Sequence, residues 1–326
     1  MFEPVAIGVD AGGTKTHVVI ARGGGTERDV IVPTSSWWPD DLPLDDPGNA
    51  RRLIAALGLG DADRLDPRAA LVMGAHRVDS QSVATTLQAY LSEVFVGRVR
   101  VHNDALLIGP AAGFTGSSVA VIAGTGSIVV ALDGTGGSRR LGGYGHLLAD
   151  EGSAPALVRD LAVAITRGAD RGELDPIALD ALAGAAGIPD GSDRVNDLAT
   201  WMHEHPSRTD WGDLAAAVFD AADLGSPMAL EVIGAHAATL AGLIAIHLTR
   251  EPRTRAVVLA GGVVTHQPRL AGAITRLVHD QHPDLPVVLL DHPPVRGAVA
   301  LARALLQPAA SAEVPANGLP TPPMGA

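Results

Sequence analysis

Two segments of this chain share one pattern, in which an apolar run leads through a glycine turn into a second β-branched run. The first reads VDAGGTKTHVVIA (residues 9–21) and the second reads VIAGTGSIVVALD (residues 121–133). A strand, a glycine turn and a strand form a hairpin, and the bare backbone N–H groups of such a turn can bind an anion. Each hairpin taken alone is also consistent with an ordinary surface turn. Two of them at matching places predict duplicated α/β domains that hold a polyphosphate between their turns.

The segments around the two hairpins repeat one order of elements. Three strands are followed by helix, strand, helix, strand and helix up to about residue 112, and a new strand begins at Val119. Mostly helical sequence fills residues 153–250, after which strand, helix, strand and helix complete the repeat. We therefore expect domains at 1–115 and 116–306, with the last helix (about 294–306) in the second domain. Residues 307–326 are rich in Pro, Ala and Gly and are expected to form a disordered tail.

Charge and composition narrow the classes of partner. The chain has 24 Lys and Arg against 36 Asp and Glu, a net charge of −12, and no basic run, so no nucleic-acid partner is expected. It has no cysteine, which excludes disulfides, thiolate zinc sites and cysteine-ligated iron–sulfur clusters. Neither a signal-peptide pattern nor about 20 uninterrupted apolar residues occur, so we expect a cytoplasmic protein without a membrane partner.

Five motifs follow one another in the order typical of one superfamily. They are GVDAGGTKT (8–16), HNDA (102–105), IAGTGS (122–127), GGYGHLLADEGS (142–153) and LAGGVV (259–264). Together they resemble the actin-like ATPase superfamily, and within it the branch of N-acetylglucosamine kinases and BadF/BadG-type ATPases. The resemblance covers residue 8 to about residue 300. It implies two duplicated ribonuclease H-like domains with a cleft between them, and ATP-dependent phosphoryl transfer to a sugar hydroxyl.

The resemblance also implies where ATP and Mg²⁺ bind. The first loop would surround the β- and γ-phosphates with Gly12, Gly13, Thr14 and Lys15. The second loop would approach them from the opposite side with Gly124, Thr125, Gly126 and Ser127. Gly261 and Gly262 would let the backbone approach the nucleoside, and Asp10 would bind Mg²⁺, through water.

Asp104 is the candidate base, which would accept the proton of the attacking sugar hydroxyl. Phosphoryl transfer passes through a loose transition state, so the protein mainly positions groups, neutralises charge and takes one proton. A carboxylate between a strand and a helix faces the cleft, and a helix N-terminus favours its ionised form. Asp is also a common N-cap residue, and a plain cap is the alternative interpretation of Asp104.

The sugar side is assigned by the same resemblance. The HNDA and GGYGHLLADEGS motifs would contact the sugar with Asn103, Asp104, Gly143, Tyr144, Gly145 and Asp150. Ser36 and Trp38, in the loop TSSWW, loosely resemble the sugar-contacting loop of N-acetylglucosamine kinases, and Gly74 would border the sugar. Packing beneath the loop is the alternative for Trp37 and Trp38. Ala149 stands where the branch usually has Gly, which places the identity of the sugar in question.

The leading hypothesis is a kinase that converts N-acetylglucosamine to its 6-phosphate and works as a homodimer. Glucosamine, N-acetylmuramic acid and other hexoses remain alternatives, because a few loop contacts decide specificity. An ATPase activator of a dehydratase or reductase would need cysteines for an iron–sulfur cluster, and the chain has none. A non-catalytic sugar sensor of a related fold carries an N-terminal DNA-binding domain, and here the first strand is expected within a few residues of Met1.

Overall fold

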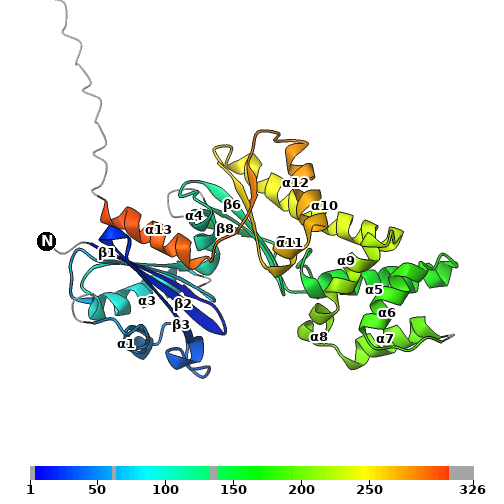
Figure 1. Cartoon of the computed structure of the whole chain (residues 1–326), viewed down its shortest axis with the longest axis horizontal. Helices are drawn as coiled ribbons and strands as arrows, with labels where there is room; N and C mark the ends of the chain where they lie inside the picture. Colours follow the sequence, from blue (N-terminus) through cyan, green and yellow to red (C-terminus); the bar gives the residue numbers. More distant parts are fainter. Residues whose placement is uncertain (1–3, 61–63, 79, 133–137, 192, 308–326) are drawn as a thin grey trace, which may run out of the picture.

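Two five-stranded sheets, one formed by residues 5–103 and the other by strands between residues 118 and 289, form the framework of the protein (Figure 1). The structure is a computed structural model and describes residues 4–60, 64–78, 80–132, 138–191 and 193–307, so the expected tail lies outside the described residues from 308 onward. The first sheet contains β1 (Val5–Ala11), β2 (Lys15–Arg22), β3 (Glu27–Pro33), β4 (Ala70–Ala75) and β5 (Arg98–Asn103). The second contains β6 (Ser118–Ala123), β7 (Ser127–Leu132), β8 (Ser138–Leu141), β9 (Val257–Ala260) and β10 (Val287–Leu289).

The two sheets have the same topology, which confirms the duplication expected from the paired hairpins. Their strand orders are β3-β2-β1-β4-β5 and β8-β7-β6-β9-β10. In each sheet the three hairpin strands pair antiparallel, and the remaining two strands are parallel to the first. Parallel strands point their carboxyl ends to one edge of a sheet, where open α/β sheets bind ligands. Both glycine turns begin at that edge.

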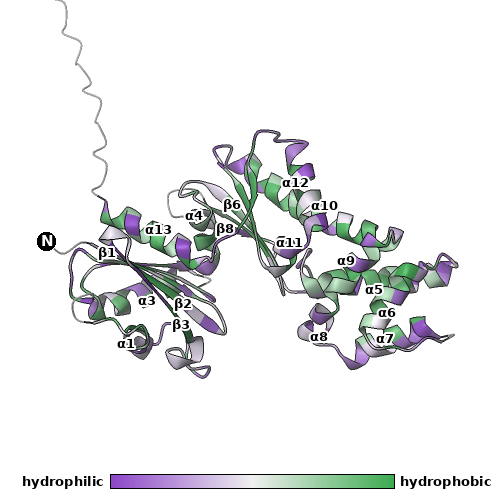
Figure 2. Ribbon diagram, viewed as in Figure 1, coloured by the Kyte–Doolittle hydropathy of each residue, from purple (hydrophilic) through white to green (hydrophobic). Residues whose placement is uncertain are grey.

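Helices cover the faces of the two sheets. One face of the first sheet packs on α1 (Pro47–Ala56) and α3 (Gln81–Val94), and the Ser80 side chain caps α3 by accepting from the Val83 N–H. One face of the second sheet lies against a helical layer, and both strand sets are apolar where the helices cover them (Figure 2). This layer comprises α5 (Ala154–Arg171), α6 (Pro176–Ala185), α7 (Arg194–Glu204), α8 (Arg208–Asp213), α9 (Ala215–Asp223), α10 (Pro227–Arg250) and α12 (Pro268–His279).

The remaining faces are covered by exchanged helices, which corrects the expected domain division. The last helix, α13 (Val295–Leu306), packs on β1, β2 and β4 of the first sheet and not on the second. In return, η3 (Asp104–Leu107) and α4 (Ile108–Ala111) place apolar side chains on the second sheet. The apolar face of α13 packs on the first sheet, where Val295, Ala298 and Val299 cover β1. The first domain therefore includes residues 295–306.

The helix α10 is long and apolar enough to cross a membrane by length and composition. In this structure it packs on α5, α9 and α12, and Leu240 and Ile244 are buried in the second domain's core. Its composition is therefore explained by its place in the helical layer of this domain. The sequence did not anticipate α11 (Gly262–His266), a short helix that begins directly at the second glycine of the LAGGVV motif.

The contact between the exchanged helices leaves no room for a side chain at Gly297. A Cβ atom added there would lie 2.0 Å from the Leu107 carbonyl oxygen. We therefore expect Gly297→Ala to lower the free energy of unfolding by about 1–3 kcal/mol, the usual cost of overpacking a core. The matched control is Gly272→Ala in α12, where an added Cβ meets nothing within 4 Å. The control should be neutral or stabilising by up to about 1 kcal/mol, because Ala favours a helix over Gly. Equal unfolding midpoints for both variants would contradict this account of the helix contact.

Candidate active site between the two domains

A cavity of about 700 Å³ lies between the two domains. The first domain and η3 line it with His76, Arg77, Asn103, Asp104 and Ala105. The second domain contributes Ile122, Gly124, Thr125, Gly126, Ser127, Ile128, Arg140, Gly143, Asp150, Ala154, Arg208, Gly261, Gly262 and Val263. The structure thus brings ten of the residues singled out in the sequence, from motifs far apart along the chain, to one cavity: Asn103, Asp104, Gly124, Thr125, Gly126, Ser127, Gly143, Asp150, Gly261 and Gly262.

The second glycine loop and the Gly261–Gly262 turn lie side by side at the wall of the cavity. A Cβ added to Gly124 would lie 3.4 Å from the Gly262 nitrogen. Gly261 has a φ of +99°, and a Cβ there would lie 2.5 Å from the Ala123 carbonyl oxygen, so only glycine fits. At Gly262 an added Cβ would project into open space. This wall therefore presents bare backbone to the cavity, as close contact with a phosphate or a nucleoside requires.

The first glycine loop lies beside the cavity, and its four residues are not lining residues. The Gly12 N–H donates to the Lys15 carbonyl (3.0 Å), and the Thr34 hydroxyl donates to the Gly12 carbonyl (2.8 Å). A Cβ on Gly13 would lie 3.9 Å from the ring of His76, which does line the cavity. Gly13, Thr14 and Lys15 are exposed, so the loop stands open next to the mouth of the cavity.

Asp104 is the first residue of η3, and Asn103 is the residue that caps this helix. The Asn103 side chain accepts from the Ala105 N–H (3.1 Å), and Asp104 Oδ1 also lies 2.9 Å from that nitrogen. The N-cap residue of η3 is thus Asn103, and the alternative interpretation of Asp104 as a plain N-cap applies to its neighbour instead. Gly74 lies inside β4 and is not a lining residue, and a Cβ there would lie 3.1 Å from the Cα of Asp104, which lines the cavity. Gly74 therefore lets the backbone that carries Asp104 approach the sheet.

Asp10, at the end of β1, is electrostatically coupled to Asp104. Burial, together with the Asp104 carboxylate, raises the pKa of Asp10 to about 6, and His17 and Lys15 act in the opposite direction. A divalent cation bound between two carboxylates removes the repulsion between them, and carboxylates are ligands that Mg²⁺ prefers. Among the described residues no group of three or more His, Cys, Asp or Glu forms a metal cage. Mg²⁺ needs no such cage, since it is held by one or two carboxylates together with phosphates and waters, so these residues fit it.

Several expected sugar contacts lie elsewhere. Trp38 is 8% exposed in the first domain's core and its indole N–H donates to the Leu42 carbonyl (2.9 Å), while Trp37 donates to the Thr16 hydroxyl (2.8 Å). Both tryptophans thus pack beneath the loop, as the alternative interpretation held. Ser36 donates to the Pro33 carbonyl at the surface, and Tyr144 is 74% exposed and is not a lining residue.

Asp150 lines the cavity and lies against the second glycine loop. It is 5% exposed, and its Oδ1 accepts from the Gly145 N–H (2.9 Å), so Gly145 contributes to the site through this aspartate. A Cβ on Gly126 would lie 3.4 Å from Asp150 Oδ2. Asp150 has a φ of +64°, a conformation that is costly for a residue other than glycine and that is concentrated at functional sites.

Three arginines of the lining were missed by sequence reasoning. Arg77 follows β4, Arg140 lies in β8, and Arg208 begins α8. They come from separate elements and form no motif, so only the fold brings them together. Arg77 has a φ of +65°, and its guanidinium lies 6.0 Å from the centre of the Trp38 ring. The arginines give the cavity a local positive character within a chain of net charge −12.

Comparison with known proteins places this site in a family. The chain has two duplicated sheets around a shared cavity, and its fold matches that of solved structures named as sugar kinases. Residues 7–302 match the model of the BadF/BadG/BcrA/BcrD ATPase family, and the chain belongs to this family. This confirms the resemblance and the fold class expected from the five motifs.

Individual relatives point in the same direction. The chain is 23% identical over 325 residues to the N-acetyl-D-glucosamine kinase of Dictyostelium discoideum, covering 93% of this chain and 98% of that one. It is 30% identical over 154 residues to the N-acetylmuramic acid/N-acetylglucosamine kinase of Clostridium acetobutylicum, covering 45% of this chain and 48% of the relative. A solved structure of a candidate N-acetylglucosamine kinase from Chromobacterium violaceum superposes with a TM-score of 0.61 at 22% identity, covering 94% and 99% of the two chains.

The raised pKa of Asp10 gives a stability test. Because its folded pKa of about 6 lies above the ordinary 3.8, its ionised form costs stability, and the cost grows as pH rises from about 4 to 6 and is complete above. In chelator, Asp10→Asn should therefore unfold at a higher temperature than the parent at pH 8 and at the same temperature near pH 4. Asp170→Asn, an exposed site in α5, is the control and should show no such difference. If Asp10→Asn is less stable than the parent at pH 8, the ionised Asp10 carboxylate does not destabilise the folded protein and this account is wrong.

Proposed function

We propose that the protein is an ATP-dependent kinase that phosphorylates an amino sugar, with N-acetylglucosamine as the first candidate and the 6-hydroxyl as the acceptor. One observation carries the proposal: Asp104 of the first domain and the bare glycine turns of the second line the same cavity. A base on one side and phosphate-binding amides on the other is what phosphoryl transfer requires. The family membership and the activities named for the two relatives support it.

Each wall of the cavity has a part in this reaction. The backbone N–H groups of residues 125–127 and the arginines hold the polyphosphate beside Gly124, whose own N–H donates to the Gly126 carbonyl, and residues 261–262 allow the nucleoside to approach. The first loop would close on the β- and γ-phosphates, and Asp10 would hold Mg²⁺ there. When bound, Mg²⁺ neutralises charge on the phosphates. Asp104 accepts the proton of the sugar hydroxyl, and Asn103, Gly143 and Asp150 contact the sugar. The first loop stands beside the cavity here, so catalysis needs the two domains to close.

The alternatives are weaker on specific grounds. An ATPase activator would hold an iron–sulfur cluster with cysteines, and the 326 residues contain none. A non-catalytic sensor has no need of a carboxylate at the position of Asp104. Among kinases, N-acetylmuramic acid, glucosamine and other hexoses stay open as substrates, since Trp38 does not line the cavity and Ala149 stands beside Asp150. We also expect a cytoplasmic homodimer.

Substrate identity is tested by coupled ADP release from Mg-ATP with a panel of sugars. The panel contains N-acetylglucosamine, glucosamine, N-acetylmannosamine, N-acetylmuramic acid and glucose. We expect turnover with an N-acetylated amino sugar well above the sugar-free rate. Equal rates with and without every sugar, despite bound ATP, would reject the kinase and favour another ATPase of the family.

The role of Asp104 is tested by Asp104→Asn, which keeps an oxygen for the Ala105 N–H. Turnover should fall by about 10²–10⁴-fold, the usual contribution of a general base. The affinity for ATP, measured by calorimetry, should stay within a few fold, because Asp104 contacts the acceptor. A variant with near-normal turnover would show that another group takes the proton, and a variant that loses ATP binding would show that Asp104 acts on the nucleotide side.

A further inference from the structure

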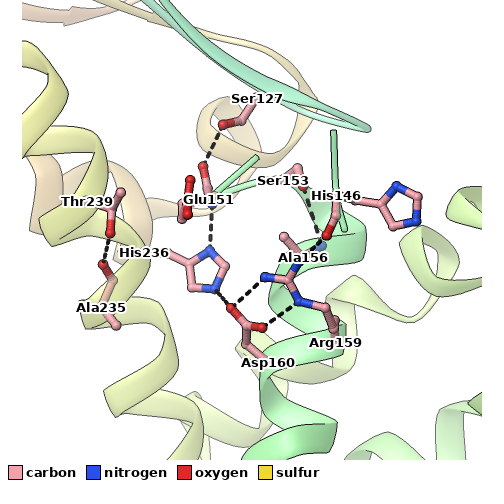
Figure 3. A network of polar contacts seen from close by, with 11 residues as sticks. Ser127, His146, Glu151, Ser153, Ala156, Arg159, Asp160, Ala235, His236 and Thr239 are labelled. Carbon is pink, nitrogen blue, oxygen red and sulfur yellow. Dashed lines mark hydrogen bonds and ion pairs between the residues drawn. The ribbon is translucent and has the colours of Figure 1, made fainter. Parts of the chain in front are cut away.

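His236 is a buried polar residue in the middle of the apolar helix α10. It is 2% exposed, and its two ring nitrogens both have partners (Figure 3). The Gly152 N–H donates to Nδ1 over 2.6 Å, so Nδ1 carries no proton. Nε2 must then carry it and donates to Asp160 Oδ2 over 2.8 Å. The two contacts fix one neutral tautomer, and a second proton would set an N–H against the Gly152 N–H.

Asp160, on α5, binds both His236 and Arg159 through its carboxylate. Besides His236 it binds Arg159, whose Nε lies 2.6 Å from Asp160 Oδ1. Arg159 in turn donates to the His146 carbonyl. Although partial burial raises the pKa of Asp160, the hydrogen bonds from His236 and Arg159 lower it to about 2, so the carboxylate stays charged. Asp160 therefore holds segment 146–152 at both ends, through Arg159 at His146 and through His236 at Gly152.

The same helix surface fits Gly152 closely. Gly152 has a φ of +85°, and an added Cβ would lie 2.6 Å from the side chain of Leu240, one helical turn after His236. The backbone at Gly152 is thus pressed against α10 and tied to it by a hydrogen bond. A buried histidine in an apolar helix costs stability unless both ring nitrogens are hydrogen-bonded. His236 meets this requirement through Gly152 and Asp160, and its bond to Gly152 fixes the position of the turn.

The segment held in this way carries the strained Asp150 and is bound to the second glycine loop. The Ser127 hydroxyl donates to the Glu151 carbonyl (2.6 Å), and the Ala154 N–H donates to the Gly124 carbonyl (2.8 Å). Asp150 stands in the left-handed region at a φ of +64°. That conformation costs energy and persists only where surrounding contacts impose it. The network around Asp160 supplies those contacts from the side away from the cavity.

We propose that His236 and Asp160 are positioning residues that set Asp150 and the turn 150–152 against the second glycine loop. They contact neither substrate and act through the turn. This inference rests on the proposed function, because it assigns Asp150 to the acceptor site. In the proposed reaction the network determines how well the acceptor sugar is held, and the proton stays on Nε2 of His236 throughout.

The test compares two substitutions that each keep one half of the His236 contacts. His236→Gln can still donate to Asp160 but has no acceptor for the Gly152 N–H, whereas His236→Asn keeps an acceptor near the Nδ1 position. With the sugar identified by the panel, His236→Gln should raise the KM for the acceptor at least tenfold and the KM for ATP much less. His236→Asn should restore most of the acceptor KM. Asp160→Asn, a partly exposed site, should also raise the acceptor KM by loosening His146, and it tests the network if His236→Gln does not fold.

The matched control is His247→Gln in the same helix. His247 is 5% exposed and its Nε2 lies 3.3 Å from the Thr254 hydroxyl, so it is similarly buried, and in the described part of the chain it has no hydrogen bond to residues 146–152. It should lower the unfolding temperature and leave the acceptor KM unchanged. An equal rise in KM for His247→Gln, or an unchanged KM for both His236→Gln and Asp160→Asn, would overturn the proposal.

Hydrogen exchange separates this proposal from the proposed function. Amides of residues 145–153 should lose protection in His236→Gln and keep it in His247→Gln, whatever reaction the protein catalyses. If no sugar is phosphorylated but this loss is seen, the kinase assignment fails and the positioning network stands. Unchanged protection in His236→Gln would overturn the network directly.

Discussion

The cavity depends on the exchange of helices between the two domains. The chain leaves the first sheet through η3 and α4, which pack on the second sheet, and returns through α13, which packs on the first. The two crossings touch where Gly297 meets the Leu107 carbonyl, three residues from Asp104. The candidate base therefore sits on the element that joins the domains. Because η3 contacts strands of both sheets, the position of Asp104 relative to the glycine turns of the second domain depends on this crossing.

Electrostatics in this protein are local. The chain has a net charge of −12, so its overall charge does not attract a polyphosphate. The cavity instead supplies local attraction from bare amides of two glycine turns and from three arginines drawn from separate elements. Asp104 lines the first domain's side of the cavity with Arg77, and Asp10 lies behind it, where burial, together with the Asp104 carboxylate, raises its pKa to about 6. A cation bound there together with an anion across the cavity would neutralise both walls, so the apo site is arranged for a charged pair of ligands.

Much of this arrangement could be predicted because it is local in the sequence. Glycine turns between β-branched runs, and an Asn-Asp pair between a strand and a helix, depend on neighbouring residues, so both hairpins and the position of Asp104 were found. The paired TSSWW tryptophans were ambiguous because burial depends on what covers a loop, and only the fold shows Thr16 and Leu42 as their partners. The place of α13 could not be predicted from chain order, since an apolar helix face does not show in the sequence which sheet it will cover. Arg77, Arg140 and Arg208 lie outside any motif and meet only after folding.

The two domains hold the segments beside the cavity in different ways. In the first domain the glycine turn is braced directly by Thr34, which binds both its backbone and Thr16. In the second domain the segment that carries Asp150 is an addition between β8 and the helical layer, without a strand to fix its register. A strand would be held by ladder hydrogen bonds, whereas a glycine-rich segment is held only where side chains reach it. His146 and Gly152, at the ends of this segment, are tied to Asp160 through Arg159 and His236, and Glu151 is tied to the second glycine loop. The buried His236 is thus the residue through which the apolar helix α10 holds the turn at Gly152.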